Sequence, residues 1–231
     1  MWCVPELTAE FIQRMEHLLA LYHKPLNPKE PVVCMDEKSK QLIADTRPVL
    51  NLRPGKLLRR DHEYKRHGTR NIFLAVEPKG GRRYTKVTNC RKKPDFAQFI
   101  KELANNDYPY ADKLHIVCDN LNTHFEKSLL ETFPKTEAKT LLKRIKFHYT
   151  PKHASWLNMA EIELSILDRQ CIKGRIPTEL QLKTKMAIWE KQRNDQKAII
   201  NWKFTVKDAR TKFRYQPTKK NQKPKKERNR S

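Results

Sequence analysis

One mainly apolar run ends in a carboxylate: Leu114-His115-Ile116-Val117-Cys118-Asp119. An earlier run, Val32-Val33-Cys34-Met35-Asp36, has the same form. Short apolar runs of this kind predict buried strands. Open α/β sheets place their sites at the carboxyl ends of strands, so Asp36 and Asp119 are expected to converge at one edge of a sheet. The alternative for Asp119 is an Asx turn followed by a helix cap.

The flanking sequence predicts an α/β fold. Apolar spacing and turn residues predict strands at 32–35, 71–77, 83–88, 114–118 and 145–149, with a hairpin turn at Gly80-Gly81. Helical patterns cover 7–23, 94–104, 125–133, 137–142 and 158–171, and further helices open at Pro177 and Thr205. This order predicts a sheet that starts as an antiparallel meander and continues with crossover connections. Residues 45–70 are basic and poorly periodic, and we interpret them as a loop or irregular insertion.

The charge of the chain indicates a polyanionic partner. Lys and Arg number 49 against 26 Asp and Glu, which gives a net charge of +23 over 231 residues. No basic amphipathic anchor stands out, so nucleic acid is favoured over a membrane surface. Four basic residues of the 45–70 segment are expected to bind the DNA backbone, and a solvated surface is the alternative: Arg59, Arg60, Lys65 and Arg66.

Several function classes are excluded by what the sequence lacks. The five cysteines are scattered without a CxxC pair, which disfavours a zinc site and fits a reduced cytoplasmic compartment. With five glycines and no GxGxxG or GxxxxGK motif, ATP-driven helicase or recombinase chemistry is disfavoured. No apolar stretch approaches the length of a membrane span.

A third acid is expected on the helix that follows Trp156. Glu161 and Glu163 lie on opposite sides of that helix, with apolar residues between them, so periodicity leaves both acids possible. Carboxylates that converge bind hard divalent cations through oxygen, and two such cations serve phosphodiester chemistry.

Three stretches carry a family resemblance: Val32–Ser39, Val117–His124 and Phe147–Glu161. Over roughly residues 2–215 the chain resembles bacterial insertion-sequence transposases of the DDE type related to the mariner superfamily. The resemblance implies a ribonuclease H-like mixed sheet flanked by helices, with Asp36, Asp119 and Glu161 as catalytic and metal-binding triad. Glu161 holds the family's position after Leu157-Asn158, and Glu163 becomes a neighbouring surface or structural acid. The 41 residues between Asp119 and Glu161 match a longer-spaced subgroup.

The resemblance also implies chemistry and partners. Mg²⁺, with Mn²⁺ able to substitute, would support cleavage and strand transfer on transposon ends and target DNA. A homodimer on DNA and association with the nucleoid are expected. Family members normally carry helix-turn-helix modules before the catalytic domain, so we expect this chain to be a truncated gene, a remnant, or one part of a split frame whose partner supplies them.

Basic residues beside the acids complete the expected site. Lys152 and His153 are candidate DNA contacts, and His124 is a candidate phosphate contact, although loop histidines usually do not catalyse. The expected domains are an N-terminal helix and linker (1–30), the catalytic domain (31–215) and a basic disordered tail (216–231). The rival hypotheses are a catalytically idle remnant that binds DNA nonspecifically and a metal-dependent nuclease of the same fold acting on RNA–DNA hybrids.

Overall fold

A five-stranded mixed sheet forms the centre of the protein. The structure, a computed structural model, describes residues 6–50, 52–57, 59–121 and 123–216. The strands are β1 (Val32–Asp45), β2 (Tyr64–Glu77), β3 (Arg82–Thr88), β4 (Leu114–Cys118) and β5 (Ile145–Tyr149), in the order β3-β2-β1-β4-β5. β1, β2 and β3 pair antiparallel, whereas β4 pairs parallel to both β1 and β5. The expected meander followed by crossovers is therefore confirmed.

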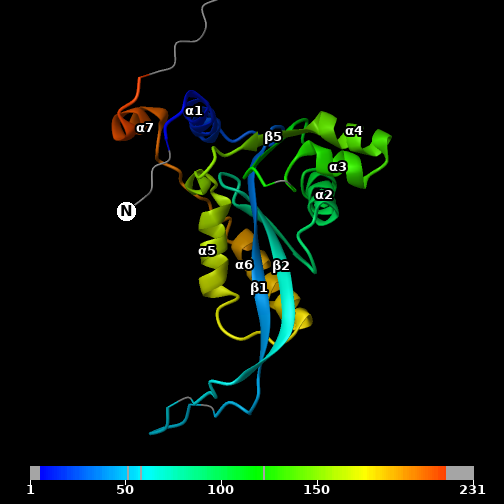
Figure 1. The fold of residues 1–231 in the computed structure, drawn as a ribbon, viewed down its shortest axis with the longest axis vertical. Coiled ribbons are helices and arrows are strands. Elements are labelled where there is room, and N and C mark those ends of the chain that lie inside the picture. Colours follow the sequence, from blue (N-terminus) through cyan, green and yellow to red (C-terminus); the bar gives the residue numbers. More distant parts are fainter. Residues whose placement is uncertain (1–5, 51, 58, 122, 217–231) are drawn as a thin grey trace, which may run out of the picture.

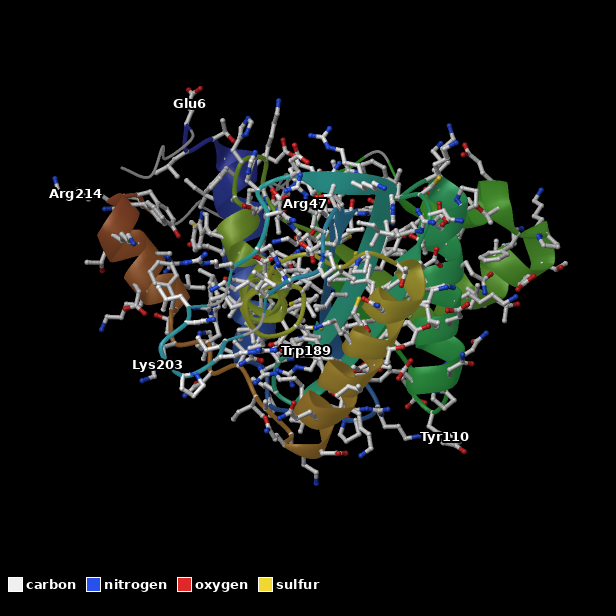
Figure 2. All side chains as sticks on the ribbon, turned by 90° about the horizontal axis from the view of Figure 1, so that it is seen from below. Glu6, Arg47, Tyr110, Trp189, Lys203 and Arg214 are labelled. Atoms are coloured by element: carbon white, nitrogen blue, oxygen red, sulfur yellow. The ribbon has the colours of Figure 1, made fainter. Side chains whose placement is uncertain are left out.

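Helices cover both faces of this sheet. They are α1 (Ala9–His23), α2 (Lys93–Glu102), α3 (Glu126–Thr132), α4 (Lys135–Arg144), α5 (Ala160–Gln170), α6 (Glu179–Asp195) and α7 (Val206–Phe213). One core layer packs α1, α5, α6 and α7 against one face, and a second packs α2, α3 and α4 against the other. Figure 2, viewed along the long axis, shows α7 and α2–α4 at opposite sides and Trp189 of α6 near the centre.

The N-terminal helix belongs to the same body as the sheet. Thr8 caps α1 by accepting a hydrogen bond from the Phe11 amide (3.1 Å). Met15, Leu18 and Leu19 of this helix are fully buried in the first core layer. The predicted tail lies, from residue 217, outside the described residues. Among the helices that the structure describes, none is long and apolar enough to cross a membrane.

Two strands are much longer than the sequence predicts. β1 runs to Asp45 and β2 begins at Tyr64, so the loop interpretation is wrong for residues 64–70 and holds only for about 46–63. Beyond the end of β3, β1 and β2 continue as a two-stranded ribbon from Lys40 opposite Arg70 to Asp45 opposite Tyr64. Cross-strand hydrogen bonds hold this ribbon, which lacks the continuous apolar run on which the prediction relied. Figure 1 shows it projecting beyond the helices as an arm.

Candidate active site

Strand pairing brings Asp36 and Asp119 to the same level of the sheet. The parallel register of β1 and β4 ends with Cys34 opposite Val117, so each acid lies two residues beyond that pair. Residues two apart in a strand share a face, and Cys34 and Val117 both belong to the core layer that contains α1 and α5. The Asp36 carboxylate therefore leaves the sheet on the side of α5, and Asp119 directly follows the last residue of β4.

Asp36 lies inside a strand and not at its end. The sequence placed it at the end of a short strand, but β1 continues for nine residues to Asp45. Because the described pairing with β4 stops at Cys34, the β4-facing edge of β1 opens just before Asp36. The end of β4, and not of β1, is what gives the Asp36 carboxylate room for a ligand.

Helix α5 begins beside Asp36, and its two acids have different environments. Glu161, in its first turn, is exposed, whereas Glu163 is fully buried. Both Glu163 oxygens accept hydrogen bonds from Arg83 (3.0 and 2.9 Å) and from Arg193 (2.9 and 3.1 Å). Burial would raise the pKa of Glu163, but these guanidinium hydrogen bonds lower it below its ordinary value. Glu163 is thus a structural acid that joins α5 to β3 and α6, and Glu161 is left free for a ligand.

Negative charge accumulates around Asp36. Burial raises the pKa of its carboxyl to about 7, against the lowering effect of a hydrogen bond from the Glu37 amide. The charges of Glu161, Glu37 and Asp119 raise it further. Since these charges act on one carboxyl, the acids lie within electrostatic reach of one another.

Asn158 connects Asp36 to the start of α5. Its side-chain amide donates to the Met35 carbonyl (2.9 Å) and to Asp36 Oδ2 (3.2 Å). Its side-chain oxygen accepts from the Ala160 amide (3.1 Å), which satisfies a free N–H at the helix N-terminus. One buried residue therefore fixes the helix that carries Glu161 relative to the strand that carries Asp36.

The loop after β4 holds Asp119 in a defined orientation. Asp119 Oδ1 accepts from the Leu121 amide (3.2 Å) and lies 2.5 Å from His124 Nδ1. The neighbouring Asn120 donates to the Thr150 carbonyl at the end of β5 (2.7 Å). The Asx turn that the sequence offered as an alternative is therefore present together with the convergence on Asp36.

His124 is buried between two carboxylates. Its Nε2 lies 2.9 Å from Glu37 Oε2, and its side chain is 1% exposed. Burial alone would lower its pKa, but Asp119 and Glu37 raise the pKa of His124 to about 9. Because both ring nitrogens face carboxylates, the expected phosphate contact by His124 is not supported.

The chemistry of the three acids fits a hard divalent cation, although their carboxylates do not lie close enough together to coordinate one ion. Asp36, Asp119 and Glu161 supply only oxygen atoms, which suit Mg²⁺ and Mn²⁺. In the part of the chain that the structure describes, no three His, Cys, Asp or Glu side chains are grouped closely enough to hold a metal ion. Like charges repel, so a cation would lower the repulsion that raises the pKa of Asp36.

A groove of about 590 Å³ opens beside the Asp119 loop. Lys152 and His153, two of the predicted DNA contacts, line it together with Asn120 and Arg14. Arg14 of α1 donates to Asn120 Oδ1 (3.2 Å) and pairs with Glu10 (2.7 Å). The groove thus places exposed cationic side chains next to the loop that holds Asp119.

The other predicted DNA contacts lie on the arm, away from this groove. Arg59 and Arg60 belong to the connection between β1 and β2, and Lys65 and Arg66 begin β2. All four are exposed. Arg60 pairs with Asp45 (3.3 Å), and Arg66 donates to the Tyr64 hydroxyl (3.2 Å).

Sequence reasoning missed the residues that support the acids. Asn158, Glu37 and Arg14 were given no role, although Asn158 lies within the quoted Leu157-Asn158 motif. An Asn two residues before a helix start is a capping signal and could have been recognised. Glu37 and Arg14 carry no such local signal, because their partners are 87 and 106 residues away in the chain.

Comparison with known proteins places the chain among enzymes of nucleic-acid cleavage. The family model described as DDE superfamily endonuclease matches residues 31–183, about two thirds of the chain. A search of curated proteins gives no match.

Solved structures of the Mos1 mariner transposase share the fold. The paired-end complex with Mn aligns with a TM-score of 0.55 at 15% identity, over 86% of this chain and 60% of that one. The Mos1 strand transfer complex gives 0.54 at 14% identity, over 86% and 59%. The paired-end complex with Mg gives 0.54 at 15% identity, over 85% and 59%. The chain thus spans about three fifths of the structures it matches, and the expected ribonuclease H-like fold is confirmed.

Proposed function

This chain belongs to the DDE endonuclease superfamily, and we propose that it is the catalytic part of a DNA transposase. The enzyme would cleave DNA strands at the ends of an insertion sequence and join them to a target. One observation carries this proposal. Asp36 and Asp119 lie at the same level of the sheet, and α5 begins beside Asp36 with Glu161 exposed in its first turn.

Asp36, Asp119 and Glu161 would hold divalent metal, with Mg²⁺ as the physiological ion and Mn²⁺ as a substitute. Such ions lower the pKa of a bound hydroxyl nucleophile and stabilise the leaving oxygen. Mos1 structures that share this fold are paired-end complexes with Mn and with Mg. This chain's own residues orient the acids: Asn158 holds Asp36, and the turn after β4 holds Asp119.

DNA is the proposed substrate. The net charge of +23 supports a polyanionic ligand. Lys152 and His153 would contact the strand that enters the active site, since they line the groove beside the Asp119 loop. Arg59, Arg60, Lys65 and Arg66 would contact the DNA backbone farther away, along the arm.

Assembly on DNA as a homodimer is part of the same proposal, because a transposase must bring two element ends together. A partner that carries helix-turn-helix modules would recognise those ends. The Mos1 structures that share the fold are paired-end and strand transfer complexes, which supports the joining of two ends.

Cleavage of supercoiled plasmid tests the function. The unaltered protein is expected to nick the plasmid and transfer strands with Mg²⁺ or Mn²⁺. Asp119→Asn should lose at least 100-fold in rate, because it removes a metal-binding charge, while DNA binding is retained. Asp195→Asn, which neutralises an exposed carboxylate on α6, is the matched control and should cleave normally.

Other outcomes select among the rival hypotheses. Metal-dependent cleavage that persists in Asp119→Asn would refute the site assignment. DNA binding without cleavage by the unaltered protein would favour an idle remnant. Faster cleavage of RNA–DNA hybrids than of duplex DNA would favour a nuclease of the same fold.

A further inference from the structure

Glu37 and His124 form a buried pair of polar side chains beside Asp119. Glu37 follows Asp36 in β1 and therefore points to the opposite face of the sheet, where its cross-strand neighbour is Phe73. The Glu37 side chain is 2% exposed. The His124 ring packs against Phe96 of the same core layer, with centroids 4.9 Å apart.

The two side chains have few partners besides each other and Asp119. Glu37 Oε2 lies 2.9 Å from His124 Nε2, and neither atom forms an aligned hydrogen bond with the described residues. On its other side, His124 Nδ1 lies 2.5 Å from Asp119 Oδ1. A buried charge pair contributes little net stability, because desolvation offsets most of its attraction. Stability alone is therefore a weak reason for placing this pair here.

The pair determines which oxygen of Asp119 is occupied. Oδ1 receives both the His124 contact and the Leu121 amide hydrogen bond (3.2 Å). Within the described residues, Oδ2 receives no hydrogen bond. Residues that orient a metal-ligating group typically contribute 10- to 100-fold to metal affinity.

We propose that Glu37 and His124 are positioning residues: Glu37 fixes the His124 ring, and the ring fixes Asp119 so that Oδ2 stays available to a divalent cation. This inference rests on the proposed function, since it assigns metal binding to Asp119. Neither residue touches the reacting atoms.

Direct titration with Mn²⁺ tests the proposal without reference to DNA cleavage. Free Mn²⁺ is followed by electron paramagnetic resonance in the unaltered full chain and in Glu37→Gln and His124→Asn. Glu37→Gln keeps the side-chain shape but removes the charge that holds His124. His124→Asn keeps a donor near Asp119 but loses the link to Glu37. Either variant alone carries the test if the other fails to fold, as judged by circular dichroism.

Both variants are expected to raise the Mn²⁺ Kd by about 10- to 100-fold. Glu102→Gln is the matched control, because it neutralises a largely buried carboxylate bound to Lys86 and Tyr84, remote from the acids. Its Kd for Mn²⁺ should not change.

Folded variants that bind Mn²⁺ as tightly as the unaltered chain would overturn the positioning role and leave Glu37 and His124 as structural residues. Absence of Mn²⁺ binding by the unaltered chain would overturn the metal site of the proposed function, and this proposal with it. Mn²⁺ binding without DNA cleavage would count against the proposed function alone, because the difference in Kd between variants still measures positioning.

Discussion

At the scale of single residues, Asn158 shows how a short polar side chain organises an active site. It makes three hydrogen bonds, to the Met35 carbonyl, the Asp36 carboxylate and the Ala160 amide. The three hydrogen bonds connect Asn158 to the β1 backbone, to the Asp36 carboxylate and to the first residue of α5. Few residue types satisfy all three, because the site needs a donor and an acceptor on one short, neutral side chain.

Asn158→Ala should therefore destabilise the protein and impair its site. Losing the amide leaves buried groups unpaired, which costs about 1–3 kcal/mol in the free energy of unfolding. Urea denaturation followed by circular dichroism measures this. Cleavage should also slow, since Asp36 loses its link to α5.

Asn105→Ala is the control for this change. Asn105 is exposed and accepts only a long contact from Arg144 (3.4 Å), so its removal should alter stability by less than about 0.5 kcal/mol. Equal effects of the two substitutions would show that Asn158 has no special structural role.

At the scale of secondary-structure elements, three histidines join α1 to the sheet. His148 of β5 lies 2.8 Å from His17 of α1 through one ring nitrogen and 2.8 Å from His115 of β4 through the other. The rings are stacked, with centroids 5.0 and 5.1 Å apart. Each of these hydrogen bonds needs one nitrogen without a proton as acceptor, so at most one of the three rings can carry a positive charge while both bonds are kept.

This stack predicts that acid weakens the fold. Burial lowers the pKa of His148 to about 3, and nearby positive charge from His17, His115 and lysines adds to this effect. The unfolded chain binds a proton at His148 below about pH 6.5, whereas the folded protein does not until about pH 3. The contribution of His148 is therefore complete above about pH 6.5 and is lost as the pH falls, by roughly 2 kcal/mol at pH 5.

Urea denaturation at pH 7.5 and pH 5.0 measures this loss. His148→Gln should show a smaller difference between the two pH values, because glutamine does not titrate. His62→Gln is the control, since His62 is exposed on the arm, and it should keep the full difference. Identical pH dependence in all three proteins would contradict the role of the stack.

At the scale of the whole molecule, basic residues occur both beside the acids and along the arm. The arm extends away from the helices (Figure 1). Arg59 and Arg60 lie in the connection at the end of the arm, Lys65 and Arg66 lie at the start of β2, and all four are exposed. Each phosphate that a cation neutralises releases counterions, which makes DNA affinity fall with salt. The arm should therefore contribute to the salt dependence of binding.

Replacing these four residues by alanine should reduce the slope of log K against log salt concentration by up to about 3–4. Fluorescence anisotropy with a labelled DNA duplex, measured at salt concentrations from about 50 to about 200 mM, provides the slope. Alanine at the four exposed lysines Lys127, Lys135, Lys139 and Lys143 of α3 and α4 is the charge-matched control. An equal change in slope for both sets would indicate that net charge, and not the arm, governs binding.

The sequence predicted those elements that local apolar patterns define, and it missed those that depend on contacts between distant segments. β4 and β5 agree with prediction at both ends, because each is a short run of mainly apolar residues that pairs in parallel with its neighbour. The predicted helix start at Thr205 is also confirmed, and Thr205 and Asp208 cap it with reciprocal hydrogen bonds. The arm was missed because hydrogen bonds to the other strand hold it, and these have no local pattern. Likewise, the predicted strand order indicated that Asp36 and Asp119 lie close together. The Glu37–His124 pair could not be predicted, because it depends on a contact between distant segments.

The parallel pairing of β1 with β4 also sets when the acids meet during synthesis. Val32 pairs with His115, and the helix that carries Glu161 follows 45 residues later. Contacts so distant in the chain form late in folding. A nascent chain whose synthesis has reached residue 150 holds two of the three acids. Under the proposed assignment, a chain therefore gains its complete set of metal-binding acids only after α5 has been translated.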